Sequence, residues 1–154
     1  MTAVTPEKTQ RNVSELAWIR LMRVYQQIDR RTAEIMKKHG LSVGRFDVLV
    51  HAGISQGRSQ QELADAMFVT KGNICQLLDG MEAEDLLYRR RKGRTNHIYL
   101  TDEGMARREA ALNEQLDVIE TAMSVLSKEE QDALHKMLRK IDRSLANDGI
   151  EKGK

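Results

Sequence analysis

Apolar residues recur at helical spacing near the start of the chain, between residues 8 and 39. They form a band with two edges, which is wider than one small neighbour can cover. Lys37 and Lys38 lie in the last turn, where positive charge complements the helix dipole, and Gly40 follows as a terminator. The pattern predicts one long helix whose surplus apolar surface faces a partner.

The C-terminal third shows the same kind of pattern twice. Thr101 is placed to cap one helix, and Ser127 with Glu130 forms a capping box for another. Apolar stripes at helical intervals run through residues 112–126 and 134–145. We therefore expect two further amphipathic helices.

Shorter elements occupy the middle of the chain. Ser42, Ser59 and Thr70 each stand where a helix N-cap is expected, and Glu62 completes a capping box with Ser59. Together they predict helices over residues 43–54, from 60 onwards, and from 71 to about 84.

Two strand-like runs follow, residues 86–91 and 96–100, joined by a tip at 92–95. Two short helices joined by a three-residue turn and followed by a hairpin make the winged form of the helix-turn-helix. The predicted fold is mainly α with a small β-hairpin wing, flanked by long helices at both ends.

Composition narrows the class of protein. The chain has 154 residues and a formal net charge of +2, so any affinity for nucleic acid must come from local patches. It has no apolar run long enough for a membrane span and no apolar signal core at its start, so we expect a cytoplasmic protein with no membrane partner. A single cysteine, Cys75, excludes an internal disulfide.

Positive charge is concentrated in the stretch LYRRRKGRTNHIYLT, residues 87–101. Five of the six residues from Arg89 to Arg94 are Lys or Arg, and the stretch holds no carboxylate. A polyanion would offset the self-repulsion of such a run. We expect Arg94, beside Gly93 at the tip, to enter a minor groove. Cations along the strand would reach phosphates, namely Arg89, Arg90, Arg91 and Lys92.

The helix that begins after Thr70 has a polar face opposite its core residues, and its acids lie in its C-terminal half. This polarity suits a helix whose N-terminal residues meet base edges in the major groove. The predicted contacts are Thr70, Lys71, Gly72, Asn73 and Gln76, with Ser59 added from the preceding helix. The alternative is an ordinary amphipathic helix with a solvated face.

The segment RSQQELADAMFVTKGNICQLLDGMEAEDLLYRRR, with NHIYLTDEG after the tip, resembles the MarR family of bacterial transcriptional regulators. The resemblance extends to the flanking helices. It implies that residues 70–76 belong to a recognition helix and that Arg94 is the wing arginine. The wing is short, and Lys92 and Gly93 replace the acid that usually precedes this arginine.

The resemblance also implies a homodimer with interlocking terminal helices, bound to double-stranded DNA. A two-fold dimer predicts a palindromic operator with half-sites about 10 bp apart. Residues 1–41 and 102–154 would form the dimerisation helices and 42–101 the DNA-binding lobe, all within one structural domain. The resemblance further implies a repressor that a small phenolic or aromatic effector releases from DNA. Residues that suit such a site, or equally a core, are Trp18, Met22, Arg23, Phe46 and His51.

Other classes of function receive less support. A Gly-rich phosphate loop, a CxxC pair and an HExxH motif are all absent from the sequence, so we expect neither an enzyme nor a cofactor. His135 with Glu129, Glu130 and Asp132 is better explained as solvated surface than as a metal site.

Two alternatives remain open at this stage. Cys75, near a helix N-terminus and Lys71, would make a redox-responsive regulator, or is a small inert residue. A winged helix also serves as a protein-interaction module without specific DNA binding. The basic wing argues against that role, because protein interfaces are depleted in lysine.

Overall fold

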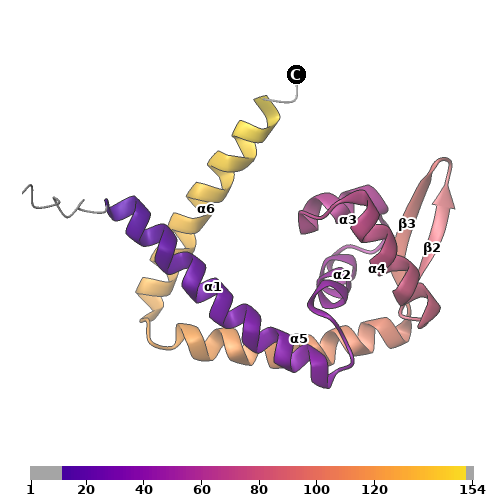
Figure 1. The fold of residues 1–154 in the computed structure, drawn as a ribbon, viewed down its shortest axis with the longest axis horizontal. Coiled ribbons are helices and arrows are strands. Elements are labelled where there is room, and N and C mark those ends of the chain that lie inside the picture. The colour runs from indigo at the N-terminus through magenta and orange to yellow at the C-terminus, as the bar shows by residue number, and fades with distance from the viewer. Residues whose placement is uncertain (1–11, 152–154) are drawn as a thin grey trace, which may run out of the picture. The chain divides into compact units, whose positions relative to one another are not determined.

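The computed structural model describes residues 12–151. They fall into two compact units, one ending at Gln115 and one starting at Leu116. Within the described residues there are six helices and three strands (Figure 1). In chain order they are α1 (Val13–Lys38), α2 (Val43–Ile54), β1 (Arg58–Ser59), α3 (Gln60–Met67), α4 (Lys71–Ala83), β2 (Leu87–Lys92), β3 (Thr95–Leu100), α5 (Asp102–Met123) and α6 (Lys128–Glu151). The predicted class, mainly α with a small hairpin wing, is confirmed.

The predicted helix caps are confirmed. The side chains of Ser42, Thr70 and Thr101 each accept a hydrogen bond from the backbone N–H three residues on. Ser59 and Ser127 form complete capping boxes with Glu62 and Glu130. Each cap satisfies backbone donors that a helix start leaves without a partner. Local chemistry therefore determines where these helices begin.

The ends of the long helices differ somewhat from the prediction. Helix α1 was expected from about residue 8 to His39 and spans Val13–Lys38, with Asn12 as its N-cap. Residues 8–11 of that prediction lie outside the described part of the chain. No helix between residues 12 and 151 is both long enough and apolar enough to span a membrane.

The core of the first unit lies between α2, α4 and the sheet, which stand together in Figure 1. Only the C-terminal part of α1 joins it, through Thr32, Ile35 and Met36. The largest fully buried side chains of this core are apolar: Phe46, Val48 and Leu49 of α2, Leu63 of α3, Ile74, Leu78 and Met81 of α4, and Leu86, Leu87 and Ile98 around the hairpin.

A third strand extends the hairpin into a sheet with the order β1-β3-β2. The segment 55–59, which lies between two predicted helices, places Arg58 and Ser59 opposite Ile98 and His97 of β3. The His97 ring nitrogen Nδ1 lies 2.7 Å from the carbonyl oxygen of Gly57, which ties the base of the wing to this strand. Two residues are too few to show a strand periodicity, so the sequence pattern did not predict β1.

Helices α3 and α4 end in the same way. Val69 N–H donates to the carbonyl of Ala64, and Leu86 N–H to that of Met81, as in a Schellman motif. The left-handed residue of such a motif is usually glycine, but here it is Phe68 at φ 54° and Asp85 at φ 59°. Both α3 and α4 therefore end at a residue that carries a backbone penalty.

A substitution at Gly104 tests how closely the start of α5 packs against the backbone between α4 and β2. A Cβ at this position would collide with the backbone carbonyl oxygen of Leu86. We expect Gly104→Ala to lower the free energy of unfolding by about 1–3 kcal/mol, the usual cost of overpacking. Urea unfolding followed by circular dichroism measures the change.

Gly72→Ala is the control for that substitution, because a Cβ at Gly72 meets nothing within 4 Å. It should leave stability unchanged or raise it by up to about 1 kcal/mol through helix propensity. Equal stability of the Gly104→Ala variant and the wild type would contradict the packing described here.

Candidate nucleic-acid interface

The start of α4 presents an exposed polar face. All five residues predicted to contact bases from this helix are exposed: Thr70, Lys71, Gly72, Asn73 and Gln76. Ile74, Leu78 and Met81 on the other side are buried. The structure thus brings the predicted contacts together at the end of the helix that suits a major groove, with Thr70 Oγ1 accepting the Asn73 N–H as the helix cap.

The register of β2 and β3 divides the wing cations between two faces. Paired residues of an antiparallel sheet share a face. Arg89 pairs with Ile98 and Arg91 with Asn96, which places both arginines on the face of the buried Ile98. Arg90 and Lys92 lie on the opposite face. The four strand cations, all expected to reach phosphates, therefore have different surroundings.

Arg89 is committed to an ion pair within the protein. Its guanidinium lies 2.8 Å from Asp79 and 2.8 Å from Glu82, both on α4, and its side chain is only 19% exposed. The expectation that Arg89 is an unpaired cation free to reach phosphate is therefore wrong. It joins the wing to α4, because the strand register turns it toward that helix.

Arg90 was expected to reach phosphates along the strand, but its aromatic environment has no signal in the sequence. Tyr88 and Tyr99 stack with ring centroids 5.5 Å apart, and the Arg90 guanidinium carbon lies 5.5 Å from each centroid. Such cation–π contacts hold the guanidinium against the sheet. The cross-strand register that creates this cluster becomes visible only in the structure.

The tip of the wing carries the most accessible charge. Gly93, at φ 62°, is the first of two turn residues and Arg94 is the second. Arg91 Nε donates to the Gly93 carbonyl, and Lys92 Nζ lies 3.4 Å from the Tyr99 hydroxyl. Arg91, Lys92 and Arg94 are all exposed, and none forms an ion pair with the side chains of residues 12–148. They are free to meet an anion.

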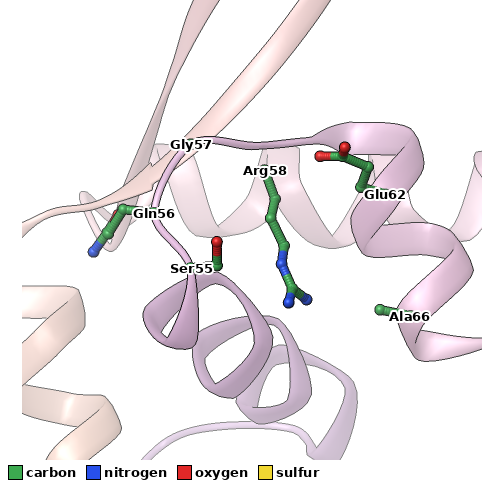
Figure 2. A pocket seen from close by; sticks show the side chains of 6 residues that line it. All are labelled: Ser55, Gln56, Gly57, Arg58, Glu62 and Ala66. Carbon is green, nitrogen blue, oxygen red and sulfur yellow. The ribbon is translucent and has the colours of Figure 1, made fainter.

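Ser59 is largely buried by its capping role. It is 8% exposed, and its hydroxyl accepts the Glu62 N–H in the capping box. Of the predicted DNA contacts, Ser59 therefore has the least accessible side chain. Beside it, Arg58 reaches into a hollow of about 470 Å³ between α2 and α3, which Figure 2 shows with Glu62 at its rim.

The residues suggested for an effector are dispersed. Trp18, Met22 and Arg23 are exposed on the N-terminal half of α1, His51 is half-buried on α2, and Phe46 is fully buried in the core. Phe46 therefore lines no open site in this conformation. Burial raises the pKa of the neighbouring Asp47, and Asp29 adds to that rise while His51 opposes it.

Cys75 is half-buried on α4, and Gln60 Nε2 of α3 donates to its Sγ at 2.7 Å. The thiol thus lies at the contact of the two helices, beside the exposed polar face. Within residues 12–151 no three His, Cys, Asp or Glu side chains gather in a way that suits a metal ion.

Large apolar side chains remain exposed on the terminal helices. On α1 they include Leu16, Trp18 and Tyr25, and on α6 Met137, Ile141 and Leu145. The three on α6 lie at helical spacing, so they form one stripe. The band on α1 and the stripe at 134–145 on α6 are the apolar surfaces that the sequence pattern indicated.

Comparison with known proteins identifies the family. A model described as the MarR family matches residues 39–95. An HTH-type transcriptional regulator of Bacillus cereus is 34% identical over 132 residues, which cover 85% of this chain and 90% of the relative. The chain belongs to the MarR family of transcriptional regulators.

Two further members extend the comparison. The HTH-type transcriptional repressor YetL of Bacillus subtilis is 38% identical over 104 residues, 64% of this chain and 62% of YetL. The fold matches that of S. aureus MepR in its complex with DNA, with a TM-score of 0.74, 22% identity and coverage of 88% of this chain and 99% of MepR. The likeness to MepR shows the fold, and membership of the MarR family makes this chain a DNA-binding transcriptional regulator rather than an enzyme.

Arg89→Ala tests the connection between wing and α4. The substitution removes two ion pairs and leaves Asp79 and Glu82 without their partner. We expect the free energy of unfolding to fall by about 1–2 kcal/mol, because the arginine is largely buried while the carboxylates are partly solvated. Chemical denaturation measures it.

The matched control is Arg91→Ala, on the same strand and face but exposed. It should change stability by less than about 0.5 kcal/mol. If both variants were equally stable, the ion pairs of Arg89 would not hold the wing.

Proposed function

We propose that this MarR-family chain is a transcriptional repressor that binds a palindromic operator as a homodimer. One observation supports the proposal above all: the exposed polar start of α4 and the unpaired wing-tip cations belong to the same compact unit. Arg89 fixes the wing to α4, so both surfaces meet one duplex together.

In this proposal α4 lies in the major groove. Asn73 and Gln76 pair with adenine edges and Lys71 with guanine acceptors. Gly72 allows close approach of the backbone to the DNA, since the protein itself leaves open space there. At the wing, Arg94 enters the minor groove, and Arg91 and Lys92 contact phosphates.

The exposed apolar bands of α1 and α6 support a dimer. Burial of several large side chains against a second copy would remove them from water, at about 25 cal/mol per Å² of apolar surface. In functional terms, segments 1–41 and 102–154 are the proposed dimerisation helices, and 42–101 the DNA-binding lobe. A two-fold dimer would present two copies of α4 to half-sites about 10 bp apart.

Repression would follow from occupancy of the promoter, and the relative YetL is named a repressor. A small aromatic effector would release the DNA by binding beside α1 and α2. Trp18, Met22, Arg23 and His51 are the proposed contacts, and an approach to Phe46 requires the core to open.

Arg94→Ala tests the DNA contact. Loss of one phosphate or groove contact should weaken binding and lower the slope of log K against log salt by about one per subunit. Fluorescence anisotropy over a salt series on a fixed duplex gives the slope. Arg143→Ala, which removes the same charge from α6, is the control and should leave the slope unchanged. If Arg94→Ala leaves both affinity and slope unchanged, the wing tip does not contact DNA.

Ile141→Glu tests the dimer. A carboxylate in the middle of the apolar stripe of α6 would have to be desolvated at the interface, so the dimer should dissociate to monomers. Light scattering coupled to gel filtration measures the mass. Asn147→Glu adds the same charge on the polar side of α6 and should remain dimeric. A dimeric Ile141→Glu variant would place the interface elsewhere.

A further inference from the structure

The turn between α3 and α4 carries an unusual residue. Phe68 is 96% exposed, and its backbone is left-handed, with φ 54° and ψ 39°. It is the most exposed of the large apolar side chains between residues 12 and 148. Neither the capping motifs nor the proposed base contacts account for an aromatic ring at this position.

Two unfavourable features coincide at this residue. A left-handed backbone is free for glycine but disfavoured for a residue with a Cβ. The ring makes almost no contact with the rest of the chain, so packing does not offset the penalty. Strained residues persist where the surroundings impose them, and they are enriched at binding sites.

Asp85 shows that the strain by itself is not the signal. It ends α4 with almost the same backbone, at φ 59°. However, Asp is among the residues that tolerate the left-handed region, and the Asp85 carbonyl accepts a hydrogen bond from Thr101 Oγ1. The Schellman motif imposes the left-handed backbone at both residues, but only Asp85 is of a residue type that tolerates it, so the aromatic residue at position 68 has no explanation within the protein.

The position of Phe68 indicates a partner. It precedes the α4 cap Thr70 by two residues, so its Cα lies within about 8 Å of that of Thr70. The next exposed residue after the cap is Lys71, followed by the polar face of α4. The ring therefore lies at the edge of the surface proposed to face DNA.

We propose that Phe68 is a DNA-contact residue, whose ring packs on the apolar C–H surface of the duplex beside the bases read by α4. Thymine methyl groups and deoxyribose rings provide that surface. The proposal rests on the proposed DNA-binding function and adds an apolar contact to it. The ring of Phe68 then strengthens binding to the operator, while its left-handed backbone lowers the stability of the α3–α4 turn.

The test compares Phe68→Gly with Phe68→Ala, using a duplex enriched from a randomised library by the wild-type protein. Both variants lose the ring and should bind this duplex roughly tenfold more weakly, the effect of losing on the order of 50 Å² of apolar contact. Only Phe68→Gly also loses the strain, so its melting temperature should rise above that of Phe68→Ala and of the wild type. Stability and affinity thus change in opposite directions.

Asp85→Gly is the matched control, since it relieves the same backbone conformation at the far end of α4. It should raise the melting temperature without weakening DNA binding. A second arm replaces thymine by uracil in the enriched duplex. If uracil weakens binding of the wild type but not of Phe68→Ala, the ring contacts a thymine methyl. If uracil changes the binding of neither protein, the ring contacts deoxyribose.

The outcomes separate the two proposals. If the wild type enriches no duplex, the proposed function fails and this inference fails with it. If the wild type binds its duplex but both Phe68 variants bind it equally well, only this inference is overturned. Weaker dimerisation of the Phe68 variants, with DNA binding of the isolated dimer unchanged, also overturns it, because the ring would then contact protein.

Discussion

The ion pairs of Arg89 with Asp79 and Glu82 are the interaction on which the arrangement of the wing depends. A two-stranded hairpin is marginal by itself in water, so its direction must be fixed from outside. Arg89 connects it to α4, and Ile98 and Leu87 anchor its base in the core. As a result, the cations at the tip keep one orientation relative to the exposed face of α4.

The same connection determines which charges reach a ligand. The acids near the end of α4 would repel DNA if they were free, but Asp79 and Glu82 are compensated by the arginine of the wing. Arg91, Lys92 and Arg94 remain unpaired among the described residues. A nearly neutral chain thereby concentrates positive potential at one end of its DNA-binding lobe, where it attracts phosphates.

The sequence predicted those features that depend on short-range chemistry. Ser42, Ser59, Thr70 and Thr101 cap helices as expected, because a cap is formed with an N–H only three residues away. It did not predict what depends on register or burial. Arg89 meets its partners only once β2 folds back on α4, and Ser59 appeared available until the structure showed it buried. The backbone of Phe68 was likewise invisible, because an aromatic residue gives no sign of a left-handed turn.

The central claim is that this MarR-family chain binds one DNA sequence in preference to others. The most direct measurement is fluorescence anisotropy of the purified protein on the DNA just upstream of its own gene, with a shuffled duplex of equal length as competitor. The protein should prefer the native fragment by at least ~10³ at physiological salt. Equal and salt-sensitive binding to both duplexes would contradict it, since it would reduce the interface to a basic wing that attracts phosphates without reading bases.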